Sequence, residues 1–221
     1  MTTAPPPDST EDLISQLAGG LAPVNRLSPP TQRAALLVTL ATLFIAALAA
    51  VRGLRADIDA KLADPSYLAA VIAAWLTGAT ATLAALEVSL PDRRRAWMWL
   101  PAPAAALWVW GVGFGCLAHW VTILEAKPVE ESSVRCLVTL VSASIPLALA
   151  LWVALGRAKP LRRNDTAWLA ALAVAAFADT AHLLCHVVEA TVFVLLMNLG
   201  LAAVIIAVLG ALGGRVLARP G

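Results

Sequence analysis

The sequence predicts an all-α, polytopic integral membrane protein, in which six transmembrane helices form a bundle with short loops. Of the 221 residues, 60% are hydrophobic and 14% are charged, whereas soluble domains hold about 45–50% and about 25%. The mean hydropathy is +0.81. A soluble core has no use for so much apolar surface, so these values argue against a soluble enzyme. The net charge of +2 is too small to indicate direct binding of nucleic acid.

Six apolar runs carry this prediction, and each is rich in Ala, Leu and Val without the alternation of a strand. A helix needs about 20 residues to cross about 30 Å of hydrocarbon. The runs cover residues 34–51, 67–90, 97–121, 134–155, 166–188 and 191–216. We therefore expect a tail at 1–33, a six-span domain at 34–217 and a short C-terminus at 218–221.

Basic residues predict the orientation of the bundle, because Lys and Arg gather in the cytoplasmic loops of membrane proteins. With the N-terminus in the cytoplasm, eleven basic residues lie inside: Arg26, Arg33, Arg93, Arg94, Arg95, Arg157, Lys159, Arg162, Arg163, Arg215 and Arg219. Five lie outside: Arg52, Arg55, Lys61, Lys127 and Arg135. Trp97, Trp99, Trp168 and Trp120 then fall at the two interfaces, where Trp is enriched. We expect both termini to be cytoplasmic.

The tail begins with polar and Pro-rich sequence and shows no cleavable signal, so we expect it to be retained. Ser9 or Thr10 can cap a short helix over 11–18, which has acidic residues in its first turn. Leu13, Ile14 and Leu17 lie on one face of that helix. This face is typical of a helix that binds in a groove of a partner protein, although a fraying turn in a disordered tail would explain it too.

All three cysteines approach the outer end of a predicted span. Cys116 lies about 28 Å along the third span from Trp97, and Cys185 lies about 25 Å along the fifth span from Trp168, at 1.5 Å per residue. Cys136 lies in the first turn of the fourth span. Because the orientation rests on charges and not on cysteines, this shared depth is an independent observation.

The three histidines accompany these cysteines. His119 follows Cys116 by one helical turn, and His182, Cys185 and His186 share one helix face. Asp179 lies one turn before His182, and we expect it to accept a hydrogen bond from that histidine. An acid inside a span is a functional candidate because its burial is costly.

Two chemistries fit this cluster, and so does a purely structural role for small apolar side chains. The thiols can form a disulfide in an oxidising compartment. Alternatively, Cys136, Cys185 and His186 can bind a transition or heavy metal ion, with the other histidines nearby. No CxxC or HExxH motif supports a dedicated metal site, so we expect no required cofactor.

Other motifs have structural explanations. The glycines at 111, 113 and 115 lie inside a span, where small residues allow close helix packing. Pro146 should bend the fourth span, with Ser142 and Ser144 binding the freed carbonyls. Glu87 should reach toward Arg93, Arg94 and Arg95. The sequence shows no hydrolase triad, phosphate loop or paired catalytic carboxylates, so we expect the protein not to be an enzyme.

Several segments together resemble the NrsF family of six-span anti-sigma factors. They are EDLISQLA at 11–18, PVNRL at 23–27, LADP at 62–65, LPDRRR at 90–95, GCL at 115–117, SVRCL at 133–137, and the fifth-span cysteine with Phe193. The order and spacing of these segments make the resemblance specific over nearly the whole chain. The family commonly has His-Cys-Pro-Glu in the fifth span, where this chain has LCHVVE at 184–189.

The resemblance implies a function at the bacterial inner membrane. It implies that the tail, through Leu13, Ile14, Leu17, Val24, Arg26 and Leu27, binds a sigma factor of the extracytoplasmic-function type. It also implies that Cys136 and Cys185 sense oxidative or metal stress in the periplasm, with Cys116 nearby. Two alternatives use the same residues: a membrane thiol-disulfide oxidoreductase, and a transporter of small solutes or metals with Asp179 and His182 along its path.

Overall fold

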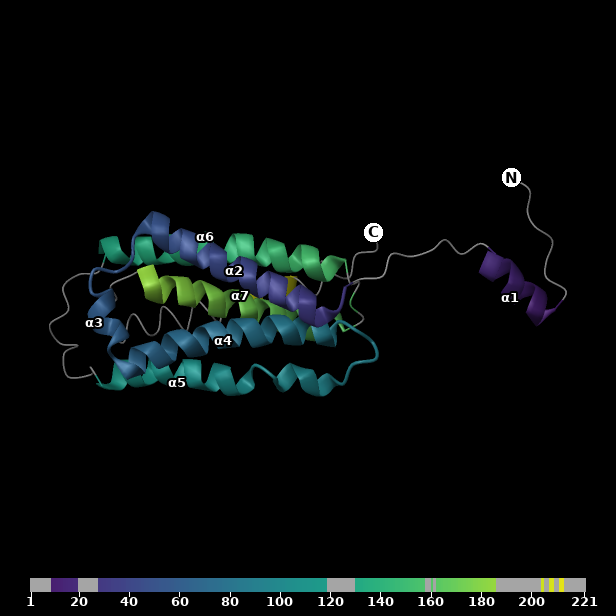
Figure 1. The fold of residues 1–221 in the computed structure, drawn as a ribbon, viewed down its shortest axis with the longest axis horizontal. Helices are drawn as coiled ribbons and strands as arrows, with labels where there is room; N and C mark the ends of the chain where they lie inside the picture. Colours follow the sequence, from purple (N-terminus) through teal and green to yellow (C-terminus); the bar gives the residue numbers. More distant parts are fainter. Residues whose placement is uncertain are drawn as a thin grey trace.

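A computed structural model describes residues 9–19, 28–118, 130–157, 160, 162–185 and single positions at 204, 207, 208, 211 and 212. Helices contain most of these residues, and the described part of the chain contains no strand. The predicted all-α class is therefore confirmed. Figure 1 shows the long helices side by side in one bundle, with a short helix apart from them.

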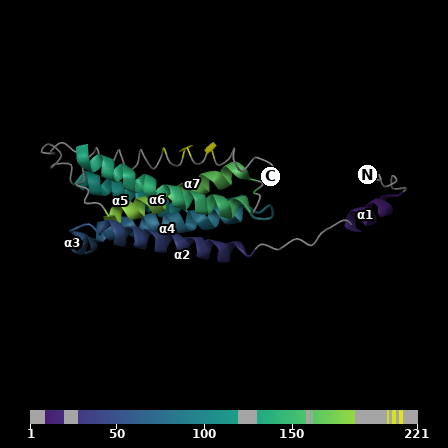
Figure 2. The ribbon, with the colours of Figure 1, turned by 90° about the horizontal axis from the view of Figure 1, so that it is seen from above.

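Helix α1 (Thr10–Gly19) confirms the short helix expected in the tail. Ser9 caps it, because its Oγ accepts a hydrogen bond from the Asp12 backbone N–H at 3.2 Å and donates to the Asp12 carboxylate at 2.9 Å. Glu11 and Asp12 lie in the first turn, where a negative charge complements the helix dipole. In Figures 1 and 2, α1 is separate from the bundle.

Three helices of the bundle are long and apolar enough to cross a membrane: α2 (Pro30–Arg52), α4 (Pro65–Val88) and α7 (Arg163–Cys185). Helices α4 and α7 lie at its centre and pack on each other along their length. Small residues allow this approach. A Cβ atom at Gly78 would lie 2.8 Å from the Phe177 ring, so the ring occupies the space that glycine leaves.

The third apolar run forms two elements instead of one helix. A 3₁₀ helix, η1 (Arg95–Trp99), precedes α5 (Ala102–Ala118). Pro101 and Pro103 lack the backbone N–H that a continuous helix needs, and proline is tolerated only in a first turn. The expectation of one helix from Trp97 was therefore wrong, and α5 begins after Trp97 and Trp99.

Helix α6 (Glu130–Gly156) contains Pro146, as the sequence predicted. The hydroxyl of Ser144 donates to the Leu140 carbonyl at 2.7 Å. Ser142 instead accepts a hydrogen bond of 3.4 Å from Arg52 at the end of α2. Ser144 thus binds a backbone carbonyl of its own helix, whereas Ser142 accepts from a side chain of another helix.

A short helix, α3 (Ile58–Leu62), interrupts the segment between α2 and α4, where only a loop was expected. Gly53 begins this segment with φ +86° and ψ 144°, a conformation that is essentially limited to glycine. Asp64 ends it by capping α4, since its carboxylate accepts a 2.9 Å hydrogen bond from the Ser66 N–H.

One end of the bundle, which we call the arginine end, brings together the start of α2, the end of α4, η1, the end of α6 and the start of α7. The buried carboxylate of Glu87 lies 3.0 Å from Arg93, as expected from the sequence. Arg95 pairs with Asp165 on α7 at 3.1 Å, and Arg33 donates to the Ala154 carbonyl on α6. These contacts join helices that are distant in sequence.

The opposite end, which we call the α3 end, contains the ends of α2, α5 and α7 and the starts of α4 and α6 (Figure 1). The sixth predicted run, 191–216, lies almost entirely outside the described residues. In α6, the apolar stretch Leu140–Gly156 is shorter than the three crossing helices. Three helices long and apolar enough to cross a membrane are thus found among the described residues, and the count of six remains a prediction.

Candidate functional site

The apolar face of α1 is the first candidate site. Leu13 and Ile14 are 42% and 60% exposed, and α1 has no extensive contact with the other described helices. Leu17 is part of the helix, but its side chain lies outside the described residues. Exposed adjacent apolar side chains on a capped, acidic helix leave a surface that a partner can cover.

The remaining tail residues of the predicted partner site are not described by the structure. Val24, Arg26 and Leu27 all lie in the segment 20–27, outside the described residues. The structure resumes at Ser28, directly before α2. Of the predicted partner site, the structure therefore describes the side chains of Leu13 and Ile14.

The second candidate site is the α3 end, where the cysteine-bearing parts of three helices lie at the same end of the bundle. Cys116 lies in the last turn of α5, Cys136 in the second turn of α6, and Cys185 at the last residue of α7. The side chains of Cys116 and Cys136 lie outside the described residues, as do His119 and His186. The helix ends share one end of the bundle, and only the Cys185 thiol has described surroundings.

Cys185 is half-buried and has no disulfide partner among the described side chains. Leu183 and Leu184, which precede it, are also half-buried. Arg52 at the end of α2 lies within electrostatic reach of the thiol.

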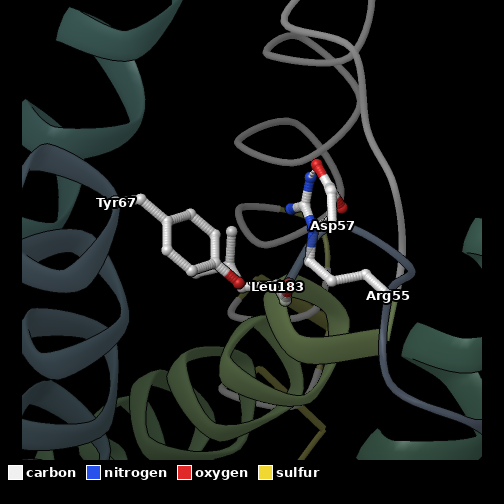
Figure 3. Close-up of polar contacts among 4 residues, drawn as sticks. All are labelled: Arg55, Asp57, Tyr67 and Leu183. Carbon is white, nitrogen blue, oxygen red and sulfur yellow. Dashed lines mark hydrogen bonds and ion pairs between the residues drawn. The ribbon is translucent and has the colours of Figure 1, made fainter. Parts of the chain in front are cut away.

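A polar cluster drawn in Figure 3 holds this end of α7 in place. The Tyr67 hydroxyl on α4 donates a 2.7 Å hydrogen bond to the Leu183 carbonyl. The backbone N–H of Arg55 donates to the Leu184 carbonyl at 3.1 Å. Two elements thus bind consecutive carbonyls in the last described turn of α7, immediately before Cys185.

Arg55 is the centre of this cluster, and its side chain is only 5% exposed. Its guanidinium makes two hydrogen bonds to the Asp57 carboxylate, at 2.7 and 2.8 Å. Its other contact is the Tyr67 ring, whose centroid lies 5.3 Å away, within the range of a cation–π interaction. A buried charge is tolerated only when it is paired, so Asp57 keeps Arg55 in this position.

The ion pair is charged at neutral pH. The hydrogen bonds from Arg55 are the main cause that lowers the pKa of Asp57 below its ordinary value. The same hydrogen bonds raise the pKa of Arg55. Because the pKa of Asp57 is lowered, its contribution to stability is present at neutral pH and is lost as the pH falls through that lowered pKa.

A third group of predicted residues lies inside the bundle. His182 is fully buried and Asp179 is 4% exposed. The Asp179 carboxylate accepts a hydrogen bond of 2.8 Å from the indole N–H of Trp108 on α5. Trp108 is thus buried as a hydrogen-bond donor. The pair joins α5 to α7.

The predicted metal ligands do not form a described site. Within the described part of the chain, no group of three His, Cys, Asp or Glu side chains is arranged to hold an ion. Two of the three expected ligands, Cys136 and His186, have no described side chain. The metal site therefore stays a prediction.

Sequence reasoning missed Arg55, Asp57 and Tyr67. Arg55 was counted only as one basic residue of an outer loop, and Tyr67 only as the start of a span. The arginine and aspartate at i and i+2, next to a glycine, give a local signal of a structured loop. No sequence signal shows that this loop binds the end of α7, about 120 residues further on.

Taken together, the described residues define a helical protein with a hydrophobic bundle suited to a membrane and a separate amphipathic helix suited to a partner. Comparison with protein families finds the NrsF family, described as negative regulator of sigma F, over residues 17–219. The chain therefore belongs to the NrsF family, and it is a negative regulator of a sigma factor. The match begins at Leu17 and so includes only the last residues of α1.

Two further comparisons add no relative. Neither the curated proteins nor the solved structures include a significant match to the chain.

Proposed function

We propose that the chain is an anti-sigma factor of the bacterial inner membrane, and that α1 and the following connector sequester a sigma factor of the extracytoplasmic-function type. The observation that carries this proposal is the exposed apolar face of α1, with Leu13 42% and Ile14 60% exposed. Family membership makes a sigma factor the partner. A groove on that partner would cover Leu13 and Ile14 and keep it from RNA polymerase.

In this proposal the bundle anchors the tail and carries the signal. The arginine end faces the cytoplasm, because α2 starts there and connects to the tail. The α3 end then faces the periplasm with Cys116, Cys136 and Cys185. Oxidation of these thiols, or their binding of a metal, changes the bundle and weakens the hold of the tail.

The signal can act only through its different affinity for the two states of the bundle. A shift from about 1% to about 99% released sigma factor requires about 5.5 kcal/mol. A disulfide contributes about 2–4 kcal/mol, and thiolate-bound metal ions contribute more. Either chemistry is therefore of the right order, and both remain part of the proposal.

A non-enzymatic role is also part of this proposal. In the oxidoreductase alternative, the same thiols would turn over a dithiol substrate. In the transporter alternative, Asp179 and His182 would line a path. Asp179 and His182 are both buried, and Asp179 accepts a hydrogen bond from Trp108. These observations favour a structural role for Asp179 and His182.

The direct test replaces Ile14 by aspartate in the full-length protein. A charge on the apolar face could stay in the groove only by losing its hydration, which is costly. Ile14→Asp should therefore reduce copurification of the sigma factor at least tenfold and raise transcription from the promoters of that sigma factor. The matched control is Ser15→Asp, which adds the same charge on the opposite face of α1.

The control should bind like the original protein. Unchanged copurification with Ile14→Asp, at equal protein levels in the membrane, would contradict the role of α1. A loss of binding that is equal in both variants would show that charge alone, and not the apolar face, determines the result.

A further inference from the structure

The segment between α2 and α4 contains a set of contacts that the proposed function does not use. Arg55, Asp57 and Tyr67 come from this segment and the start of α4, and Arg55 and Tyr67 bind backbone carbonyls in the last described turn of α7 (Figure 3). We propose that these three residues form a clamp on the end of α7, and that the clamp sets the accessibility of the Cys185 thiol. The inference rests on the proposed function only where it connects this thiol to sigma-factor release.

Two backbone carbonyls in the last described turn of α7 accept hydrogen bonds from other elements. In α7, the Leu183 carbonyl accepts from Tyr67 at 2.7 Å, and the Leu184 carbonyl accepts from the Arg55 backbone N–H at 3.1 Å. These donors come from α4 and from the segment before α3, so they tie the end of α7 to two other elements. The thiol of Cys185 follows directly.

The side chain of Arg55 is buried and paired. It is 5% exposed, and Asp57 binds it with two hydrogen bonds of 2.7 and 2.8 Å. The Tyr67 ring covers the guanidinium from 5.3 Å. Tyr67 thus contacts Arg55 with its ring and α7 with its hydroxyl. The ion pair, the ring and the carbonyl bond depend on one another, because loss of Asp57 would leave a buried charge without its partner.

Backbone hydrogen bonds hold Asp57 in place. The Ile58 N–H donates to the Arg55 carbonyl at 3.2 Å, and the Lys61 N–H donates to the Asp57 carbonyl at 3.0 Å. Helix α3 therefore fixes Asp57 next to Arg55. Gly53 supplies the left-handed turn that leads the chain from α2 into the clamp. These local contacts hold the clamp without help from the thiol.

The consequence is that the half-buried Cys185 thiol reacts faster when the clamp opens. Tyr67, Arg55 and Asp57 are positioning residues, since each acts on the thiol through the backbone of α7. A neutral hydrogen bond contributes about 0.5–1.5 kcal/mol net, which corresponds to about a twofold to tenfold change in the open population. Loss of the ion pair should have the larger effect, because one charge would remain buried.

The experiment measures alkylation of Cys185 by N-ethylmaleimide in the purified full-length protein, in which Cys116 and Cys136 are replaced by serine. Tyr67→Phe removes the hydroxyl and keeps the ring, and it should raise the alkylation rate about twofold to tenfold. Asp57→Asn should raise it by tenfold or more. Asp59→Asn is the matched control, because Asp59 is exposed on α3 and its side chain takes no part in the clamp.

A second thiol separates a local clamp from general loosening. Ser89 is 2% exposed at the arginine end, beyond the last residue of α4, and Ser89→Cys in a background without the native cysteines reports on that end. Clamp variants should leave the alkylation rate of this thiol unchanged. An equal rise at both thiols, or no rise at Cys185 in either clamp variant, would overturn the inference.

Sigma-dependent transcription, measured with all native cysteines present, tests the proposed function separately. If Cys185 senses the stimulus, Tyr67→Phe should lower the amount of oxidant or metal needed for half-maximal release. Faster alkylation with no shift in this response would support the clamp and contradict the sensing role of Cys185.

Discussion

Asp179 illustrates how a carboxyl group is accommodated among apolar helices. Its carboxylate accepts the indole N–H of Trp108 at 2.8 Å, and both residues are 4% exposed. A buried polar group without a partner costs about 1–3 kcal/mol. The hydrogen bond therefore offsets the burial of Asp179 and connects α5 to α7.

Replacement of Trp108 by phenylalanine should lower the free energy of unfolding by about 1–3 kcal/mol, because Asp179 then stays buried without its donor. Thermal unfolding of the purified protein in detergent measures the effect. Trp152→Phe is the control, because Trp152 is 49% exposed on α6. Equal stabilities of the two variants would show that the hydrogen bond contributes little.

The sequence predicted the partner of Glu87 and did not predict that of Asp179. Glu87 and Arg93 are six residues apart, so the end of one helix and the next loop bring them together. Asp179 and Trp108 are 71 residues apart. Helical periodicity shows which residues share a face, but it does not show which neighbouring helix that face contacts.

At the scale of elements, the closest packing is between α4 and α7. A Cβ atom at Gly78 would lie 2.8 Å from two carbons of the Phe177 ring, which is 2% exposed. Alanine favours a helix by about 1 kcal/mol over glycine, whereas overpacking a core costs about 1–3 kcal/mol. The ring at this position is buried and would have to shift, so we expect the cost to exceed the gain.

Gly78→Ala should therefore destabilise the bundle by about 1 kcal/mol or more. The matched control is Gly156→Ala, since nothing lies within 4 Å of a Cβ atom there. The control should unfold at or above the original temperature. The double variant Gly78→Ala/Phe177→Leu should recover part of the loss, and a stabilising effect of Gly78→Ala alone would contradict the packing argument.

Helix positions were predicted more accurately than helix breaks. The apolar runs at 34–51, 67–90 and 166–188 correspond to α2, α4 and α7 within a few residues. An apolar run directly marks the segment whose side chains are unfavourable in water. The break between η1 and α5 depends on two prolines within one run, and α3 is too short to leave a periodic pattern. Both were missed for these local reasons.

At the scale of the whole molecule, charge and topology agree. Arg33, Arg93, Arg95 and Arg162 are linked to neighbouring elements at the arginine end, whereas Arg52, Arg55 and Lys61 belong to the α3 end. The helical class and the two ends could be predicted from hydropathy and charge. The clamp could not, because it depends on contacts between segments about 120 residues apart.

In the proposed function, the tail and the α3 end lie on opposite sides of a membrane. The most direct measurement is labelling of spheroplasts with an impermeant maleimide, using full-length variants in which the native cysteines are serine. One variant carries Ser15→Cys in α1, and the other carries Asp59→Cys in α3; both positions are exposed. We expect labelling of Asp59→Cys in intact spheroplasts and of Ser15→Cys only after lysis. Labelling of Ser15→Cys before lysis, or protection of Asp59→Cys until lysis, would contradict the account.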